Sequence, residues 1–455
     1  MLHSCSLNYD RRTMTIWSPA LPDSDSPIYV RVADALERDV RAGTLISGSR
    51  LPTHRDLARN LGITPVTVTR AYGEAARRGL VEASTGRGTY VRASRRDPTP
   101  VGDIDMCTNV INTPTPILTP AILRRAADTL DARYNLGQSS ERHRAAGAAW
   151  MGRHTDPSRV LVTAGTQHAV LVAFAATARP GETVLAESVT YHGARAVAAM
   201  LNIKLAPLPM DRYGLLPDAL ARAGRARTAK VLYTIPSLHN PTGIVMPEKR
   251  RREIAEVAEK YGITIIEDDV CGFLLEKTPP PIASFAPDRT LFLSGLGKAL
   301  AAGIRVGYVC APEPLLPRVQ SMVAASVLFT SPLLAEIATS WIEDGTAARI
   351  VAQKRAEAAL RNRVARRILG ERAAKTDPRS GHLWIELPRR WSPDAFTEAA
   401  RRRRVRVASA SSFAVGSEIP RAVRLSIGAP ASVAELESAL NIIMGIDEER
   451  EEAVV

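Results

Sequence analysis

The alternation of short apolar runs with helix-length segments, from about residue 109 onward, most constrains the fold. Each run has the length of a buried strand, and stretches such as 166–178 and 247–261 have the length of helices. This alternation is typical of an α/β domain with a mostly parallel sheet. We predict such a domain over residues 109–455, with a smaller α+β subdomain at about 345–455. The predicted strands are 160–163, 183–186, 231–235, 263–266, 290–293 and 306–310.

Residues 26–92 show a different pattern, of three short helices followed by a hairpin. Thr53 can cap the second helix, and Thr64-Pro65 gives the third helix a strong start. Residues 93–108 contain proline, glycine and charges with little periodicity, and we predict that they form a linker.

The net charge of +13 is unevenly distributed along the chain. Residues 1–96 hold 15 Arg, no Lys and nine acidic residues, which is an excess of six positive charges. Such an excess favours a polyanionic partner for this segment. Arginine outnumbers lysine by 52 to 8 in the whole chain, so an arginine-rich composition explains the charge equally well. Because lysine is scarce, each lysine is worth inspecting as a candidate functional residue.

Several classes of site are not indicated. The four cysteines are dispersed without a C-x-x-C pair, which indicates neither a zinc site nor a disulfide framework. The chain has no run of 18 apolar residues and no apolar core of signal-peptide type. We therefore predict a cytoplasmic protein without a membrane span or a metal site.

The helices of residues 26–92 have the arrangement of a helix-turn-helix, in which the second helix of the pair enters the major groove of DNA. The helix that begins at Thr64 would present its outer face to bases or phosphates, and Arg87 at the hairpin tip could reach the backbone or the minor groove. A small basic helical domain without a DNA role is the alternative. The candidate DNA-contacting residues are Arg50, Arg55, Thr64, Thr67, Arg70 and Arg87.

Four segments of this unit closely resemble the GntR-type winged helix-turn-helix: 48–58, 66–72, 78–81 and 86–91. The resemblance covers nearly all of residues 26–92. It implies a bacterial transcription regulator that binds double-stranded operator DNA as a dimer.

Lys298 follows an apolar strand run and has small or apolar neighbours from Leu291 to Leu300. A lysine that must lose its proton to form a Schiff base benefits from such surroundings, because desolvation lowers its pKa. A lysine that extends to solvent from a helix start is the alternative.

Three further segments follow predicted strands, where the ligand sites of α/β folds form. Asp268, or its neighbour Asp269, could pair with a protonated pyridine nitrogen. Asn240 offers an amide to a ring oxygen, and backbone N–H groups at residues 164–167 could hold a phosphate at a helix start. Each segment alone could be a simple turn or a solvated loop, but their order along the chain is a strong signal.

In this order the segments resemble the fold-type I aminotransferases, which depend on pyridoxal 5'-phosphate (PLP), over about 109–430. The resemblance implies PLP as cofactor, Lys298 as the Schiff-base lysine and Asp268 as the partner of the pyridine nitrogen. Arg424 matches the arginine that grips a carboxylate of the substrate or effector. The implied cofactor-binding residues are Gly165, Thr166, Gln167, Tyr191, Asn240, Asp268, Lys298 and Arg305.

Two positions depart from the aminotransferase pattern. Cys271 stands where the family usually has a tyrosine that donates to the ring oxygen, and a thiol is a weak donor. Gly295 removes a hydroxyl that normally contacts the phosphate, a loss of about 1–3 kcal/mol if the acceptor stays buried. Cofactor binding is therefore better supported than full catalytic turnover.

A winged helix joined by a short linker to such a domain resembles the MocR/GabR subfamily of GntR regulators. This resemblance implies a second domain that senses PLP, an amino compound or both, and a head-to-tail homodimer. We predict a PLP-dependent transcriptional regulator. The alternatives are a working aminotransferase that carries a DNA-binding domain, and a DNA-binding protein whose large domain holds no cofactor.

Overall fold

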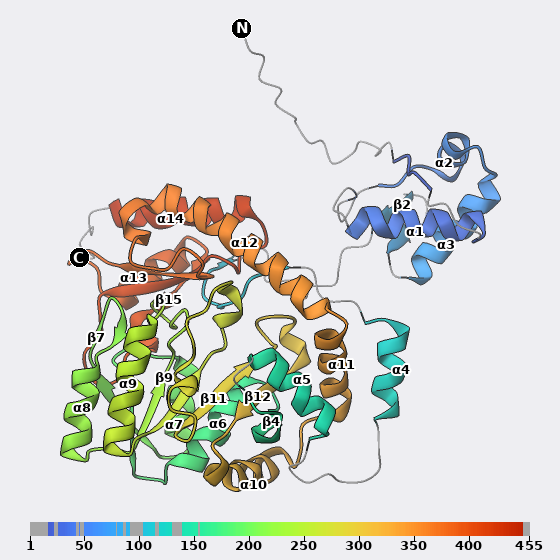
Figure 1. Ribbon diagram of the computed structural model, residues 1–455. Coiled ribbons are helices and arrows are strands. Elements are labelled where there is room, and N and C mark those ends of the chain that lie inside the picture. Colours follow the sequence, from blue (N-terminus) through green and yellow to red (C-terminus); the bar gives the residue numbers. More distant parts are fainter. Residues whose placement is uncertain are drawn as a thin grey trace. The chain divides into compact units, whose positions relative to one another are not determined.

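The chain divides into two compact units, Met1–Val101 and Gly102–Val455 (Figure 1). The structure is a computed structural model that describes residues 17–21, 26–41, 45, 50–78, 80–84, 88–91, 103–113, 118–129, 139–152 and 155–448. In these described ranges no helix is long and apolar enough to cross a membrane.

The first unit contains three helices and a two-stranded antiparallel hairpin. The helices are α1 (Ile28–Arg41), α2 (His54–Leu61) and α3 (Pro65–Arg77), and the hairpin pairs β1 (Val81–Ser84) with β2 (Gly88–Val91). The side chains of Thr53 and Thr64 accept backbone hydrogen bonds at the starts of α2 and α3, so both predicted caps form. The three helices and the hairpin share one core, which includes Val32, Leu36, Leu57, Val68, Tyr72 and Val91.

The second unit is built on a seven-stranded sheet in the order β4-β12-β11-β10-β9-β5-β6. Strand β12 is antiparallel to both of its neighbours, and the other pairs are parallel. The prediction of an α/β domain with a mostly parallel sheet is confirmed, and each of the six predicted runs contributes a strand. The strands are β4 (Val160–Thr163), β5 (Thr183–Glu187), β6 (Lys204–Leu208), β9 (Val231–Thr234), β10 (Thr264–Asp268), β11 (Thr290–Gly295) and β12 (Gly307–Cys310).

Helices cover both faces of this sheet. On one face α6 (Thr166–Thr177) packs its apolar side chains against Tyr233, Leu291 and Leu293. On the other face α8 (Pro217–Ala226) and α9 (Glu248–Tyr261) pack against Leu232 and Ile265. Further helices of the large unit are α4 (Pro120–Asp128), α5 (Glu141–Met151), α7 (His192–Met200), α10 (Leu316–Val327) and α11 (Pro332–Glu343).

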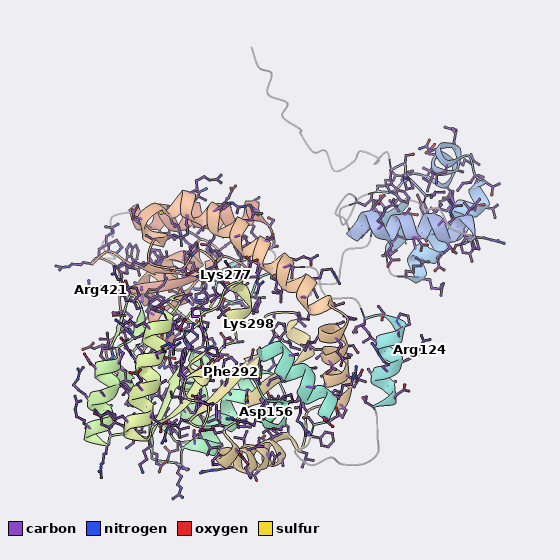
Figure 2. All side chains as sticks on the ribbon, viewed as in Figure 1. Arg124, Asp156, Lys277, Phe292, Lys298 and Arg421 are labelled. Carbon is purple, nitrogen blue, oxygen red and sulfur yellow. The ribbon has the colours of Figure 1, made fainter. Side chains whose placement is uncertain are left out.

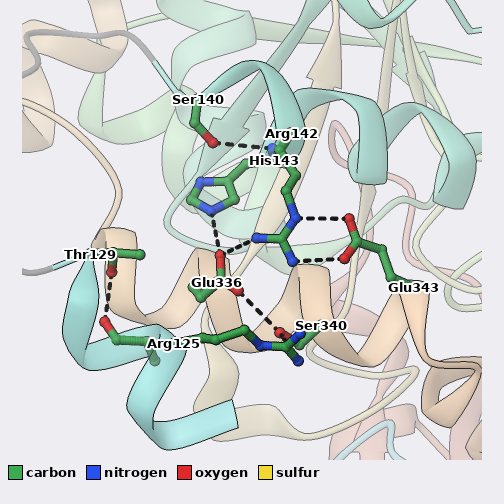
Figure 3. A network of polar contacts seen from close by, with 9 residues as sticks. Arg125, Thr129, Ser140, Arg142, His143, Glu336, Ser340 and Glu343 are labelled. Carbon is green, nitrogen blue, oxygen red and sulfur yellow. Dashed lines mark hydrogen bonds and ion pairs between the residues drawn. The ribbon is translucent and has the colours of Figure 1, made fainter. Parts of the chain in front are cut away.

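A polar network joins α5 to α11 beside the sheet (Figure 3). Glu336 is only 3% exposed, and its carboxylate accepts hydrogen bonds from Arg142 at 2.5 Å and Ser340 at 3.2 Å. The Nε2 atom of His143 lies 3.3 Å from the same carboxylate. Arg142 also binds Glu343 through two nitrogens. This network compensates the charge of a buried carboxylate, which would otherwise be costly.

The long helix α12 (Thr346–Leu369) leads from the large sheet to a small subdomain (Figure 1). This subdomain has a three-stranded antiparallel sheet in the order β13-β16-β15. Its elements are β13 (His382–Glu386), α13 (Pro393–Arg402), β14 (Val405–Arg406), β15 (Ala408–Ser409), β16 (Ala422–Ser426) and α14 (Val433–Glu448).

The structure differs from the sequence prediction at residues 103–108, which were placed in the linker. Strand β3 (Ile104–Asp105) pairs in parallel with β14, and the side chain of Met106 is fully buried in the core of the small subdomain. A strand of two residues is too short to produce a detectable alternation, so local pattern could not distinguish it from a linker.

Candidate functional site

Three neighbouring parallel strands of the large sheet end beside one another and carry residues that the sequence singled out. Asp268 ends β10, and Lys298 follows β11, which pairs with β10 in parallel. Asn240 follows β9, on the other side of β10. Figure 2 labels Lys298 in the large unit, with Phe292 on the strand that leads to it. The site thus lies where ligands bind in parallel α/β folds.

Lys298 lies next to the residue that departs most clearly from the aminotransferase pattern. Its Nζ atom is 3.8 Å from Sγ of Cys271 and 5.9 Å from the centre of the Tyr191 ring. Burial raises the pKa of the Cys271 thiol, so this side chain stays protonated near neutral pH. The position that usually carries a tyrosine therefore faces Lys298, but presents only a weak donor.

Asp268 is 1% exposed and is held by one side chain that sequence analysis did not single out. Its Oδ2 atom accepts a hydrogen bond of 2.7 Å from the hydroxyl of Tyr233. Within the described part of the chain, its Oδ1 atom has no hydrogen-bond partner. Burial raises the pKa of Asp268, whereas the Tyr233 hydrogen bond and the charge of Lys298 lower it.

The neighbouring carboxylate, Asp269, has different surroundings. It lines a separate cavity of about 580 Å³ together with Ser294 and Arg251. The charge of Lys298 acts on the pKa of Asp268, whereas the charge of Arg251 acts on that of Asp269. Of the two aspartates, Asp268 is the one whose pKa is lowered by the charge of Lys298.

Arg424 and Asn240 are linked to each other. Arg424 is 2% exposed, and its Nη1 atom donates to Oδ1 of Asn240 at 2.6 Å, while Nη2 donates to the carbonyl of Cys107. Its guanidinium lies over the Phe413 ring, 4.8 Å from the centre. Burial lowers the pKa of Arg424 to about 10, so the side chain remains charged at neutral pH. A buried cation with this fixed orientation suits a carboxylate ligand.

The start of α6 forms a cradle of backbone and guanidinium groups. Gly165 has a φ of 85°, and a Cβ atom there would lie 2.9 Å from the Arg305 guanidinium. A Cβ atom on Gly307 would lie 2.6 Å from the carbonyl carbon of Gly165. Both positions therefore require glycine. The backbone N–H groups at the start of α6 and the Arg305 guanidinium lie together there, and such groups stabilise a bound anion. Gln167 turns toward α7 instead and donates to the carbonyl of Gly193 at 3.0 Å.

Gly295 and Thr166 form a close pair at this cradle. A Cβ atom on Gly295 would lie 2.2 Å from the Oγ1 atom of Thr166. The threonine hydroxyl therefore occupies the space into which a side chain at position 295 would extend. Ser294 does not replace the hydroxyl that is missing at position 295. Its own hydroxyl accepts a hydrogen bond from Trp150 on the opposite side of the strand.

These residues fit PLP. Oδ1 of Asp268 is a buried acceptor without a partner, which suits a protonated ring nitrogen. The glycines at 165 and 307 open an anion cradle that any larger side chain would fill. Lys298 supplies the amine, with the Tyr191 ring beside it.

The first unit places most of the predicted DNA-contacting residues at the surface. Thr64 and Arg70 are exposed on α3 and Arg55 is exposed on α2, while Thr67 is half-buried. The hydroxyls of Thr64 and Thr67 lie 2.9 Å apart. Arg87 lies outside the described residues.

Arg50, another candidate DNA-contacting residue, does not lie on a helix. It forms a β-bridge with Tyr90, and its side chain passes 3.0 Å from the position of a Cβ atom on Gly88. Arg50 therefore belongs to the hairpin side of the unit, whereas α2 begins four residues later at His54.

Comparisons with known proteins agree with both units. Residues 102–443 match the family described as aminotransferase class I and II, and residues 28–91 match the bacterial regulatory proteins of the gntR family. The chain therefore belongs to the aminotransferase class I and II family. With a gntR-family unit before that domain, its domain pair is that of the MocR/GabR-type regulators, and the resemblance noted from the sequence is confirmed.

Individual relatives are similar to different shares of the chain. The uncharacterized HTH-type transcriptional regulator YdeF of Bacillus subtilis is 30% identical over 94% of this chain and 96% of that protein. The mitochondrial kynurenine/alpha-aminoadipate aminotransferase of Rattus norvegicus is 32% identical, over 42% of this chain and 49% of that enzyme.

Solved aminotransferase structures share the fold of the large unit. An archaeal alanine:glyoxylate aminotransferase has a TM-score of 0.69 at 22% identity, covering 77% of this chain and 92% of its own. The kynurenine aminotransferase of Pyrococcus horikoshii, solved with PMP, has a TM-score of 0.68 at 20% identity, over 78% of this chain and 93% of its own. Aminotransferases of this fold are PLP-dependent, which agrees with the cofactor prediction.

Proposed function

We propose that this protein is a transcriptional regulator that binds operator DNA through its first unit and senses PLP, or an amino compound that reacts with it, through its second. The observation that carries the proposal is the pairing of Lys298 with a buried, partly unpartnered Asp268 in a chain that begins with a gntR-family unit. Its expected setting is the cytoplasm, and its expected assembly is a head-to-tail homodimer.

The residues of the site have separate roles in this proposal. Lys298 binds the cofactor covalently, Asp268 accepts from its ring nitrogen, and Tyr191 stacks on its ring. Asn240 contacts the ring oxygen, while Arg424 binds the carboxylate of an amino effector. The phosphate is held by Gly165, Thr166, Arg305 and the backbone N–H of Gln167. When bound, PLP supplies an aldehyde that reacts with amines and a ring that withdraws electrons.

The test is DNA binding measured with and without the cofactor. We expect the affinity for DNA from the region upstream of this gene to change by about 5- to 150-fold on adding PLP or a reactive amino acid. Fluorescence anisotropy at a fixed salt concentration measures this affinity for DNA. The Lys298→Ala variant should bind DNA but not respond to PLP.

Two outcomes would contradict the proposal. An affinity for DNA that neither PLP nor a panel of amino acids alters would remove the sensor function. Steady multiple turnover with an amino acid and a keto acid would instead favour the working aminotransferase, for which the retained Lys298 and Arg424 are the supporting residues.

We expect Gly295→Ala to weaken PLP binding by about 1–2 kcal/mol, roughly tenfold. The added methyl group must displace the Thr166 hydroxyl from the phosphate end without supplying a hydroxyl of its own. Gly295→Ser should lose less, because its hydroxyl replaces the displaced one. Equilibrium titration with PLP measures both variants. In a Thr166→Ala background the Gly295→Ala loss should disappear; an equal loss there would show that the two positions act independently.

A further inference from the structure

Tyr233 lies directly behind the carboxylate that faces the cofactor. It stands on β9 opposite Ile266 of β10, and Asp268 is two residues further along β10, so the two side chains lie on the same face of the sheet. Tyr233 is 0% exposed, and its ring packs against Phe174 of α6 with the centres 5.5 Å apart. Its hydroxyl is thus fixed by the sheet and by α6, at 2.7 Å from Oδ2 of Asp268.

We infer that Tyr233 is a positioning residue for the PLP ring: its hydroxyl holds the carboxylate of Asp268 ionised and oriented, so that Oδ1 is left for the ring nitrogen. This inference rests on the cofactor assignment of the proposed function. Tyr233 does not touch the reacting atoms, and it acts through Asp268 alone.

The physical argument begins with the cost of a buried carboxylate. An ionised carboxylate away from water needs hydrogen bonds to compensate its lost hydration. Within the described residues, Tyr233 is the only side chain that donates a hydrogen bond to Asp268. Burial and the negative charge of Asp268 raise the pKa of Tyr233 well above its usual value, so the hydroxyl remains a donor throughout the working pH range.

The backbone N–H of Val270 also lowers the pKa of Asp268, and it remains in place in a Tyr233→Phe variant. The titratable groups whose charges are coupled to Asp268 are Lys298, Asp269, Cys271, Tyr191 and Glu187. Of these, Lys298 is the group that bonds to the cofactor in the proposed function, and negative charge on the others would oppose ionisation of Asp268. All of them remain in a Tyr233→Phe variant, so that change isolates the contribution of one hydroxyl.

The direction of the effect follows from the charges. Without the hydroxyl, the carboxylate of Asp268 is less stable and its pKa rises further. A more basic carboxylate competes more strongly for the proton that it shares with the ring nitrogen, so a smaller fraction of the ring nitrogen should be protonated near neutral pH. A purely structural role for Tyr233 would not produce this shift.

The experiment uses the full chain and PLP labelled with ¹⁵N in the ring, whose NMR shift reports protonation of the ring nitrogen. In Tyr233→Phe we expect the ¹⁵N shift near neutral pH to move toward that of the unprotonated ring nitrogen, and the affinity for PLP to fall by about tenfold or more. An unchanged ¹⁵N shift and affinity would overturn the inference. A wild-type protein that takes up no PLP would overturn the proposed function as well, so the two failures are distinguishable.

Two controls separate this role from general packing. Tyr308→Phe removes the hydroxyl of another buried tyrosine, 1% exposed, whose ring packs against Gly147, and it should leave both measurements unchanged. In an Asp268→Asn background, Tyr233→Phe should have no further effect, because no carboxylate remains. An equal loss of affinity in that background would mean that Tyr233 acts through packing.

A third variant covers the case in which Tyr233→Phe fails to fold. Incorporating 3-fluorotyrosine at position 233 keeps the ring and the hydroxyl, and makes the hydroxyl a stronger donor. We expect the ¹⁵N shift in that protein to move toward that of the protonated ring nitrogen. A shift that stays the same or moves the other way would contradict the inference.

Discussion

Replacing Lys298 with alanine is expected to abolish the borohydride-stable attachment of PLP to the protein. A Schiff base requires a primary amine beside the aldehyde, and alanine supplies none. Lys298 is the lysine that lies beside Cys271, Tyr191 and Asp268. After reduction and removal of free PLP, mass spectrometry of the peptide that contains residue 298 should show the adduct in the wild type and none in the variant.

The matched control is Lys354→Met. Lys354 is buried, its Nζ atom donates to the carbonyl of Ile111 at 2.6 Å, and burial lowers its pKa to about 8. On its pKa alone, Lys354 is therefore the other lysine expected to react with an aldehyde. Because none of the described residues forms an anion cradle or an equivalent of Asp268 beside it, Lys354→Met should keep the adduct. An adduct that survives in Lys298→Ala and disappears in Lys354→Met would reverse the assignment.

The second large effect is expected at the DNA-binding unit. Arg70→Ala should weaken binding to the operator by about 1–3 kcal/mol, roughly 5- to 150-fold, because an exposed arginine on the recognition helix contacts bases or phosphates. In the described residues Arg70 forms no ion pair, so its charge is available to DNA. Anisotropy titrations at one controlled salt concentration measure the loss.

Arg77→Ala provides the comparison on the same helix. Arg77 is exposed near the end of α3, but its Nε atom already donates to Glu74 at 3.0 Å. Its removal should change the affinity for DNA much less than the removal of Arg70. Equal losses in the two variants would mean that the unit binds through overall charge, and an unchanged affinity in Arg70→Ala would refute its assignment.

The fold and most of the candidate site could be predicted from local pattern. Apolar runs of strand length mark a buried parallel sheet, and polar residues directly after them mark the edge at which ligands bind. Lys298, Asp268 and Asn240 follow three such runs, and the structure brings them together. The resemblance added the roles and the identity of the cofactor, which the spacing alone does not provide.

The features that could not be predicted are contacts between segments that lie far apart in the sequence. Tyr233 lies within an apolar run, where a tyrosine has the appearance of a core residue; its partner is set by the register between β9 and β10. Arg50 precedes a helix in sequence but pairs with Tyr90, forty residues away. Met106 is buried by elements of the small subdomain. None of these contacts has a signature in a short window of sequence.

The close approach of Gly295 and Thr166 has a consequence for how such proteins diverge. A side chain at position 295 and the present conformation of the threonine exclude each other, because both would occupy the same space. Relatives that have a serine at position 295 and keep a threonine at position 166 should therefore hold that threonine in a different rotamer, with its hydroxyl turned away from position 295. The glycine at position 295 thus determines the orientation of the neighbouring hydroxyl as well as removing one of its own.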